Sequence, residues 1–132
     1  MKKLQQFIIV RLAHFCEQNT NLRSLKIDCC NLEEKSTRVL AIALARKSNK
    51  NSLRRFDLFD NEINDVAAKE LIESLYGYAN LEELALGDNR VGIGGCRVLG
   101  KLISSRTTCL RQLNLQNNEI DDNGIAILTR AF

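Results

Sequence analysis

Residues 110–120 read LRQLNLQNNEI, with an aliphatic residue at the first, fourth, sixth and eleventh positions and asparagine at the ninth. The same pattern occurs at residues 22–32, 53–63 and 81–91, except that the first copy has cysteine in the asparagine position and the second has Phe56 in the fourth position. The first leucines are separated by 31, 28 and 29 residues. A pattern that recurs at a near-constant period indicates stacked copies of one structural unit rather than a single central core.

Each copy is followed by a second apolar pattern with a spacing of four residues. From the last aliphatic residue, a small residue comes four positions on, and larger apolar residues come eight and twelve positions on. This spacing places all three on one face of a helix, and the two larger residues are expected to fill the space between helix and strands. The sets are Ser36, Ala67, Gly95 and Gly124; Leu40, Leu71, Leu99 and Leu128; and Leu44, Leu75, Ile103 and Phe132. Each unit therefore combines a strand with a helix, and the repeats span about 22–52, 53–80, 81–109 and 110–132.

The combined pattern resembles the ribonuclease-inhibitor-like class of leucine-rich repeats over residues 22–132. That class includes ribonuclease inhibitors, Ran GTPase-activating proteins and the sensor arrays of NOD-like receptors. The resemblance implies a single domain of the α/β class over residues 1–132, a right-handed solenoid that forms a segment of a horseshoe. A parallel sheet would line its concave face, and helices would form its convex face.

The pattern also predicts local structure within each repeat. Strands are expected at 24–26, 55–57, 83–85 and 112–114. Asn64 and Asp121 are candidate N-cap residues, because their side chains can accept from the free amides of a first helical turn. Gly77 suits the turn that ends a helix. The sequence GIGG at residues 92–95 predicts that the third repeat's helix starts late.

The asparagine position has a predicted structural task. Asn61, Asn89 and Asn118 should point inward and bond the main chain of neighbouring turns, because buried backbone groups need partners. Cys30 occupies this position in the first repeat and can perform the task only weakly.

The two ends of the chain leave alternatives open. Residues 1–21 are predicted to form a helix, with Ile8, Leu12 and Phe15 among its apolar positions. This helix is either an N-terminal cap or part of a further repeat. No polar capping unit follows Phe132, although solenoids need capping for solubility. The chain is therefore expected to be a fragment of a longer array or to self-associate through its last repeat.

Composition narrows the class of partner and the cellular compartment. The net charge of +3, from 19 basic and 16 acidic residues, is too small to favour nucleic acid. No apolar run approaches the length of a signal core or a membrane helix, so no membrane association is predicted. The odd number of cysteines and the lack of a framework spacing indicate reduced thiols in a cytoplasmic protein.

No catalytic site, cofactor site or metal site is predicted. His14 is the only histidine, so acid–base catalysis has one candidate group on a terminal helix. His14 and Cys16 would lie on nearly opposite faces of that helix, which does not suit a zinc site. The sequence GIGG lacks the lysine of a phosphate-binding loop. The chain is therefore not expected to be an enzyme.

Strand residues alternate between the two faces of a sheet, so the outward side chains are free to bind a partner. The predicted protein-binding residues are Lys26, Arg55, Asp57, Phe59, Glu83, Gln112, Asn114 and Gln116. Phe59 has two interpretations: an exposed aromatic anchor for a partner, or a ring folded sideways onto a neighbouring strand.

These observations favour a non-catalytic scaffold that binds another protein of unknown identity through its concave sheet face. Two alternatives come from the resemblance. One is a GTPase regulator similar to Ran GTPase-activating proteins, and the other is a fragment of a longer receptor or effector array.

Overall fold

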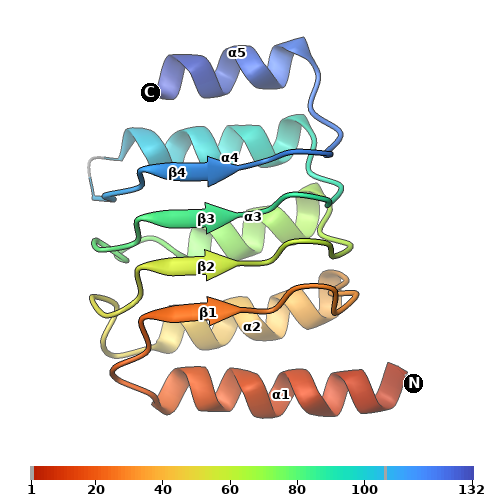
Figure 1. The fold of residues 1–132 in the computed structure, drawn as a ribbon, viewed down its shortest axis with the longest axis vertical. Coiled ribbons are helices and arrows are strands. Elements are labelled where there is room, and N and C mark those ends of the chain that lie inside the picture. The colour runs from red at the N-terminus through yellow and green to blue at the C-terminus, as the bar shows by residue number, and fades with distance from the viewer. Residues whose placement is uncertain (1, 106) are drawn as a thin grey trace.

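The chain folds into alternating helices and strands (Figure 1). The computed structural model describes residues 2–105 and 107–132. Within them the strands are β1 (Ser24–Lys26), β2 (Arg55–Asp57), β3 (Glu83–Ala85) and β4 (Gln112–Asn114). The helices are α1 (Lys2–Gln18), α2 (Glu34–Arg46), α3 (Asp65–Ser74), α4 (Ile93–Ser104) and α5 (Asp122–Ala131). All four strands coincide with the segments predicted from the repeat pattern.

The strands form one parallel sheet in chain order, β1-β2-β3-β4. Leu25, Phe56, Leu84 and Leu113 share one register position. The first three are buried against the helices, and Leu113 in the last strand is half-buried. Parallel neighbours require a crossover connection, and the helix of each repeat supplies it.

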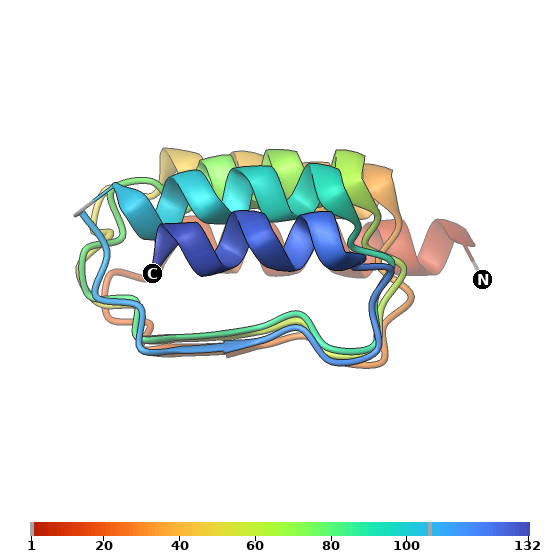
Figure 2. The same ribbon diagram turned by 90° about the horizontal axis from the view of Figure 1, so that it is seen from above.

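The strands and helices form two separate layers, which Figure 2 shows in edge view. Figure 1 shows closely spaced strands in front of helices that are fanned more widely apart, with right-handed crossovers between them. Parallel strands pair about 4.8 Å apart, whereas packed helices need about 8–10 Å. The helix layer is therefore the outer, convex side of a curved stack. The predicted α/β solenoid is confirmed.

An asparagine ladder joins successive repeats, as predicted. The Asn89 side-chain amide donates to the carbonyl oxygens of Leu58, Leu86 and Gly87 at 3.0–3.1 Å, and its Oδ1 accepts from the Ile63 N–H at 3.1 Å. Asn61 and Asn118 repeat this arrangement one repeat before and one repeat after it. Each asparagine thus bonds its own turn and the preceding one.

Cys30, in the same position of the first repeat, is exposed rather than buried. Its thiol donates to the carbonyl oxygen of Asp28, 3.1 Å away within the same turn. The described residues place no earlier strand beside β1, so this side chain has no preceding turn to join.

The helix termini confirm three of the four local predictions. Asn64 Oδ1 accepts from the Ala67 N–H at 3.0 Å, and Asp121 Oδ1 accepts from the Gly124 N–H at 2.9 Å. Gly77 adopts a φ of +90° after α3, a conformation that favours glycine.

The predicted late start of the third repeat's helix is wrong. Helix α4 begins at Ile93, two residues after Val91, just as α3 begins two residues after Ile63. Asp65 from the preceding repeat supplies the missing cap: its carboxylate accepts from the amides of Gly92, Gly94 and Gly95 at 2.7, 3.1 and 2.9 Å. A carboxylate at a helix N-terminus also interacts favourably with the helix dipole.

Helix α1 lies in the helix layer beside α2 (Figure 1). Ile9, Ala13 and Cys16 are buried in that contact. The buried Lys47, which follows α2, donates from its ammonium group to the carbonyl oxygens of Cys16 and Asn19, where α1 ends. Whether α1 is a cap or part of a further repeat stays a prediction, as do the repeat boundaries.

The expectation that Phe132 fills the space between helix and strands is wrong. Its side chain is 76% exposed, and Leu128, one turn earlier, is only half-buried. Phe132 follows the last residue of α5, and no element of the described chain lies beyond that helix (Figure 1).

Candidate interaction surface on the concave sheet

The outward strand residues form rows across the sheet. Strand pairing places Ser24, Arg55, Glu83 and Gln112 in one row, and Lys26, Asp57, Ala85 and Asn114 in the next. The central residue of each strand packs inward, so the residues on either side of it must face outward. All eight predicted binding residues therefore lie on or just after these strands, with exposed or half-buried side chains.

Charged residues in the first half of the surface pair with each other across repeats. Arg55 Nε lies 3.1 Å from Glu83 Oε1, and Lys26 Nζ lies 3.7 Å from Asp57 Oδ2. Both cationic side chains remain mostly exposed, at 67% and 60%. Exposed pairs of this kind contribute only about 0–1 kcal/mol, so a partner could replace them at little cost. The charges are balanced, which does not favour a strongly charged partner.

Phe59 folds sideways onto the next repeat and is half-buried, as in the second interpretation of the sequence. A Cβ atom added at Gly87 would lie 3.0 Å from Cδ2 of the Phe59 ring and 3.0 Å from Cγ of Gln116. Glycine at position 87 therefore makes room for the ring. The Phe59 ring beside Gly87 forms a low apolar step at the end of the sheet where the strands terminate, and the polar Gln116 side chain lies next to it.

The second half of the surface carries amides instead of charges. Gln112, Asn114 and Gln116 are all exposed. Asn114 Oδ1 accepts from the Gln116 N–H at 3.0 Å, and Asp57 Oδ1 accepts from the Phe59 N–H at the same distance. These bonds fix the turn after the strand and leave the side-chain amide of each glutamine free to donate and accept.

Three of the five cysteine thiols have a raised pKa. All five cysteines are free, and burial raises the pKa of Cys16 and Cys96. A side-chain hydrogen bond with Asp60 raises the pKa of Cys29. A raised pKa lowers the thiolate fraction at neutral pH, and with it the reactivity. No group of three or more possible metal ligands occurs within residues 2–105 and 107–132.

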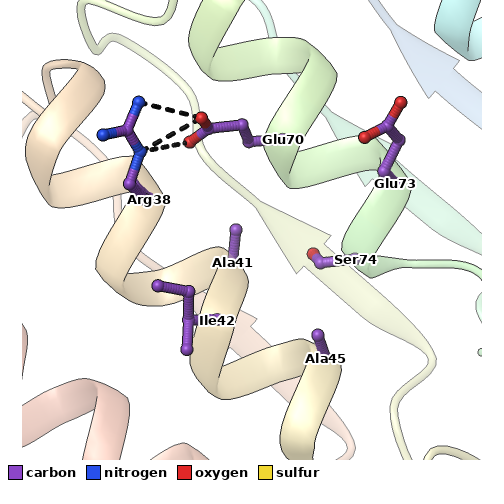
Figure 3. Close-up of a pocket in the computed structure, with 7 residues that line it drawn as sticks. All are labelled: Arg38, Ala41, Ile42, Ala45, Glu70, Glu73 and Ser74. Atoms are coloured by element: carbon purple, nitrogen blue, oxygen red, sulfur yellow. Dashed lines mark hydrogen bonds and ion pairs between the residues drawn. The ribbon is translucent and has the colours of Figure 1, made fainter.

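The helix layer carries grooves that are not predicted by the repeat pattern. One of about 430 Å³ lies between α2 and α3 (Figure 3). Arg38 Nη2 spans it to Glu70 Oε1 at 2.9 Å, while Ala41 and Ala45 line it with small side chains. The spacing of Ala41 and Ala45 was a signal for such a groove, but its depth depends on the distance between two helices, which the sequence does not give.

The ladder, the parallel sheet and the strand–helix repeat define a solenoid protein with an open sheet face. A family model described as Leucine Rich repeat matches residues 18–35, 49–71 and 107–126. The chain is a leucine-rich repeat protein.

Several curated relatives share this similarity. NACHT, LRR and PYD domains-containing protein 13 of Homo sapiens is 32% identical over 112 residues, which is 85% of this chain and 10% of the relative. Protein 12 of the same series from Mus musculus is 33% identical over 108 residues, 81% of this chain and 10% of the relative. Protein 5 of the series from Homo sapiens is 30% identical over 113 residues, which is 84% of this chain and 9% of the relative. The chain thus spans about a tenth of the length of these relatives.

The likeness indicates a role in protein interaction. Among the residues that the structure describes, no helix is both long and apolar enough to cross a bilayer.

Proposed function

We propose that this chain is a non-catalytic module that binds a partner protein through its concave sheet face. The observation that carries the proposal is that residues along each strand have two separate roles, because some are buried in the core and others face outward. Buried side chains and the asparagine ladder hold the repeats together, whereas the outward rows contribute only solvent-exposed ion pairs between repeats. Rigid scaffolds that present exposed side chains in this way are typical of repeat proteins that bind along an extended surface.

The chemistry of the surface suggests the kind of partner. Gln112, Asn114 and Gln116 can exchange hydrogen bonds with polar side chains or backbone, and the Phe59 step supplies apolar area at one edge. Arg55 and Glu83 can release each other and pair with a partner at small net cost, because both are solvated. A partner surface that mixes polar, apolar and oppositely charged groups therefore suits this face better than a strongly charged one.

A charge swap tests the proposal without removing the ion pair. Affinity purification from the native cell provides the partner, and calorimetry gives the Kd. Arg55→Glu combined with Glu83→Arg keeps one acid beside one base but inverts what the partner meets. We expect the Kd to rise about tenfold or more, because each matched contact becomes a like-charge contact.

The matched control is the same swap on the helix layer. Arg38→Glu combined with Glu70→Arg inverts the exposed pair in the α2–α3 groove and should leave the Kd unchanged. If the helix-layer swap weakens binding and the sheet swap does not, the concave face is not the binding surface.

Three further expectations remain part of the proposal. The free cysteines fit a reducing compartment such as the cytoplasm, which thiol labelling in intact cells would check.

Self-association through repeat four would use the exposed Ile125 and Phe132, and sedimentation velocity of Ile125→Asp tests it. The GTPase-regulator alternative stays a prediction, since no described contact singles out a GTPase, and a GTP turnover assay decides it.

A further inference from the structure

A second groove lies on the helix layer between α4 and α5, with a volume of about 440 Å³. Its lining includes Arg97, Gly100, Lys101, Ile127, Arg130 and Ala131. Three of these are basic, and none of the lining residues is acidic. This surface is on the opposite side of the molecule from the sheet face.

The floor of the groove is made of small residues. Gly100 is buried, and a Cβ atom added there would lie 3.3 Å from Cγ2 of Ile127 and 3.8 Å from Cβ of Ala131. The two helices therefore approach closely at this point, and the absence of larger side chains leaves the groove open above it. The backbone of a bound segment could approach this floor.

The basic side chains surround the floor. Arg97 and Lys101 are four residues apart and so project from the same face of α4. Arg130 comes from the last turn of α5, across the groove. All three are exposed, and none forms an ion pair within residues 2–105 and 107–132.

The local sequence leaves this charge uncompensated. Helix α4 contains no acidic residue, and the acidic residues of α5 are limited to Asp122 and its cap Asp121 at the far end from Arg130. Lys101 and Arg130 lie in the last turns of their helices, where a base also stabilises the helix dipole. Arg97 lies in the second turn of α4, where the dipole gives no such reason for a base.

The groove between α2 and α3 shows that this charge is not a general property of the repeat. There the single base, Arg38, is bound to Glu70, and Glu73 adds a second acid (Figure 3). The two grooves share small residues on their floors but have opposite electrostatic character. The basic character of the α4–α5 groove is therefore not shared by the α2–α3 groove.

We propose that the α4–α5 groove binds an acidic segment of a partner protein, independently of the concave face. The carboxylates of the segment would pair with Arg97, Lys101 and Arg130, and its small side chains would lie against Gly100, Ala131 and Ile127. Arginine offers forked donors that match carboxylate geometry. The apolar floor and the lack of an aromatic residue in the lining favour a peptide over single-stranded nucleic acid, which uses stacking platforms.

Fluorescence anisotropy with a labelled peptide of alternating glutamate and alanine tests the proposal on the full chain. We expect saturable binding in buffer of about 0.05 M salt that weakens steeply towards about 0.5 M, because exposed charges are screened. Arg97→Glu combined with Lys101→Glu should raise the Kd about tenfold or more. The neutral pair Arg97→Gln and Lys101→Gln should raise it by a smaller factor, and it serves if the reversed variant does not fold.

The matched control changes the net charge equally at another place on the helix layer. Arg46→Glu with Lys69→Glu removes two exposed bases from α2 and α3 and should change the Kd less than about twofold. Equal weakening by the two reversed variants would overturn the proposal, because binding would then follow net charge alone. Tighter, groove-dependent binding of single-stranded DNA or phosphatidylserine vesicles would also overturn it, since the ligand would then be phosphate.

Discussion

The same backbone conformation occurs at one position of every repeat, although the residue at that position differs. The seventh residue after the first leucine adopts a φ of 51–54° in all four repeats: Cys29, Asp60, Asp88 and Asn117. Asparagine and aspartate tolerate this left-handed region because their short polar side chains bond locally, whereas cysteine has no such compensation. The first turn therefore stores backbone strain that the other turns avoid.

Replacing Cys29 with asparagine should relieve that strain. We expect Cys29→Asn to raise the Tm by about 3 °C in a thermal melt followed by circular dichroism. Cys109→Asn, an exposed cysteine without a positive φ, is the control and should leave the Tm nearly unchanged. An equal rise in both variants would show that loss of the thiol, and not backbone strain, is responsible.

The asparagine ladder should contribute more to the free energy of unfolding where its side chains are buried. Asn89→Ala removes four hydrogen bonds and leaves the Ile63 amide and its carbonyl partners without them, which should cost about 3 kcal/mol or more. Asn118→Ala removes the same kind of bonds at a half-buried position, where water can replace them, so its cost should be smaller. Urea unfolding of the two variants measures the difference, and equal costs would contradict this explanation.

Among the helices, α4 takes its N-terminal cap from a neighbouring repeat. Helices α3 and α5 use their own N-cap side chains, whereas α4 begins with glycines and takes its cap from Asp65. Gly94 allows this contact, because a Cβ atom there would lie 3.0 Å from the Asp65 carboxyl. The start of α4 thus depends on the correct stacking of repeat two on repeat three.

Loss of Asp65 should therefore destabilise a helix in a different repeat. We expect Asp65→Ala to cost about 1–3 kcal/mol in urea unfolding and to speed hydrogen exchange at the Gly94 and Gly95 amides. Asp122 occupies the equivalent position in α5 and accepts no hydrogen bond within the described residues. Asp122→Ala should have little effect, and protection of Gly94 and Gly95 that survives the Asp65 substitution would refute capping between repeats.

At the scale of the whole molecule, the repeat period decides most of the architecture. Strands, register and the rows of outward residues could be predicted, because a period of 28–31 residues aligns Arg55 with Glu83 and Glu83 with Gln112. The sideways packing of Phe59 could not be decided, because it depends on Gly87 in the next repeat. The start of α4 and the helix-layer grooves were missed for the same reason: they arise from contacts between repeats and not from the pattern within one.

The curved stack offers a partner two faces of different character. The sheet face is balanced in charge and rich in amides, and the α4–α5 groove is basic with an apolar floor. The chain covers about a tenth of the length of the relatives it resembles, and in a solenoid each further repeat would extend both layers.

Binding through the concave face can be followed in the amide chemical shifts of the labelled chain as the purified partner is added. We expect the largest changes in residues 24–28, 55–59, 83–87 and 112–116, with little change in α2 and α3. Changes concentrated in the helices, with the strand amides unmoved, would contradict binding through the concave face.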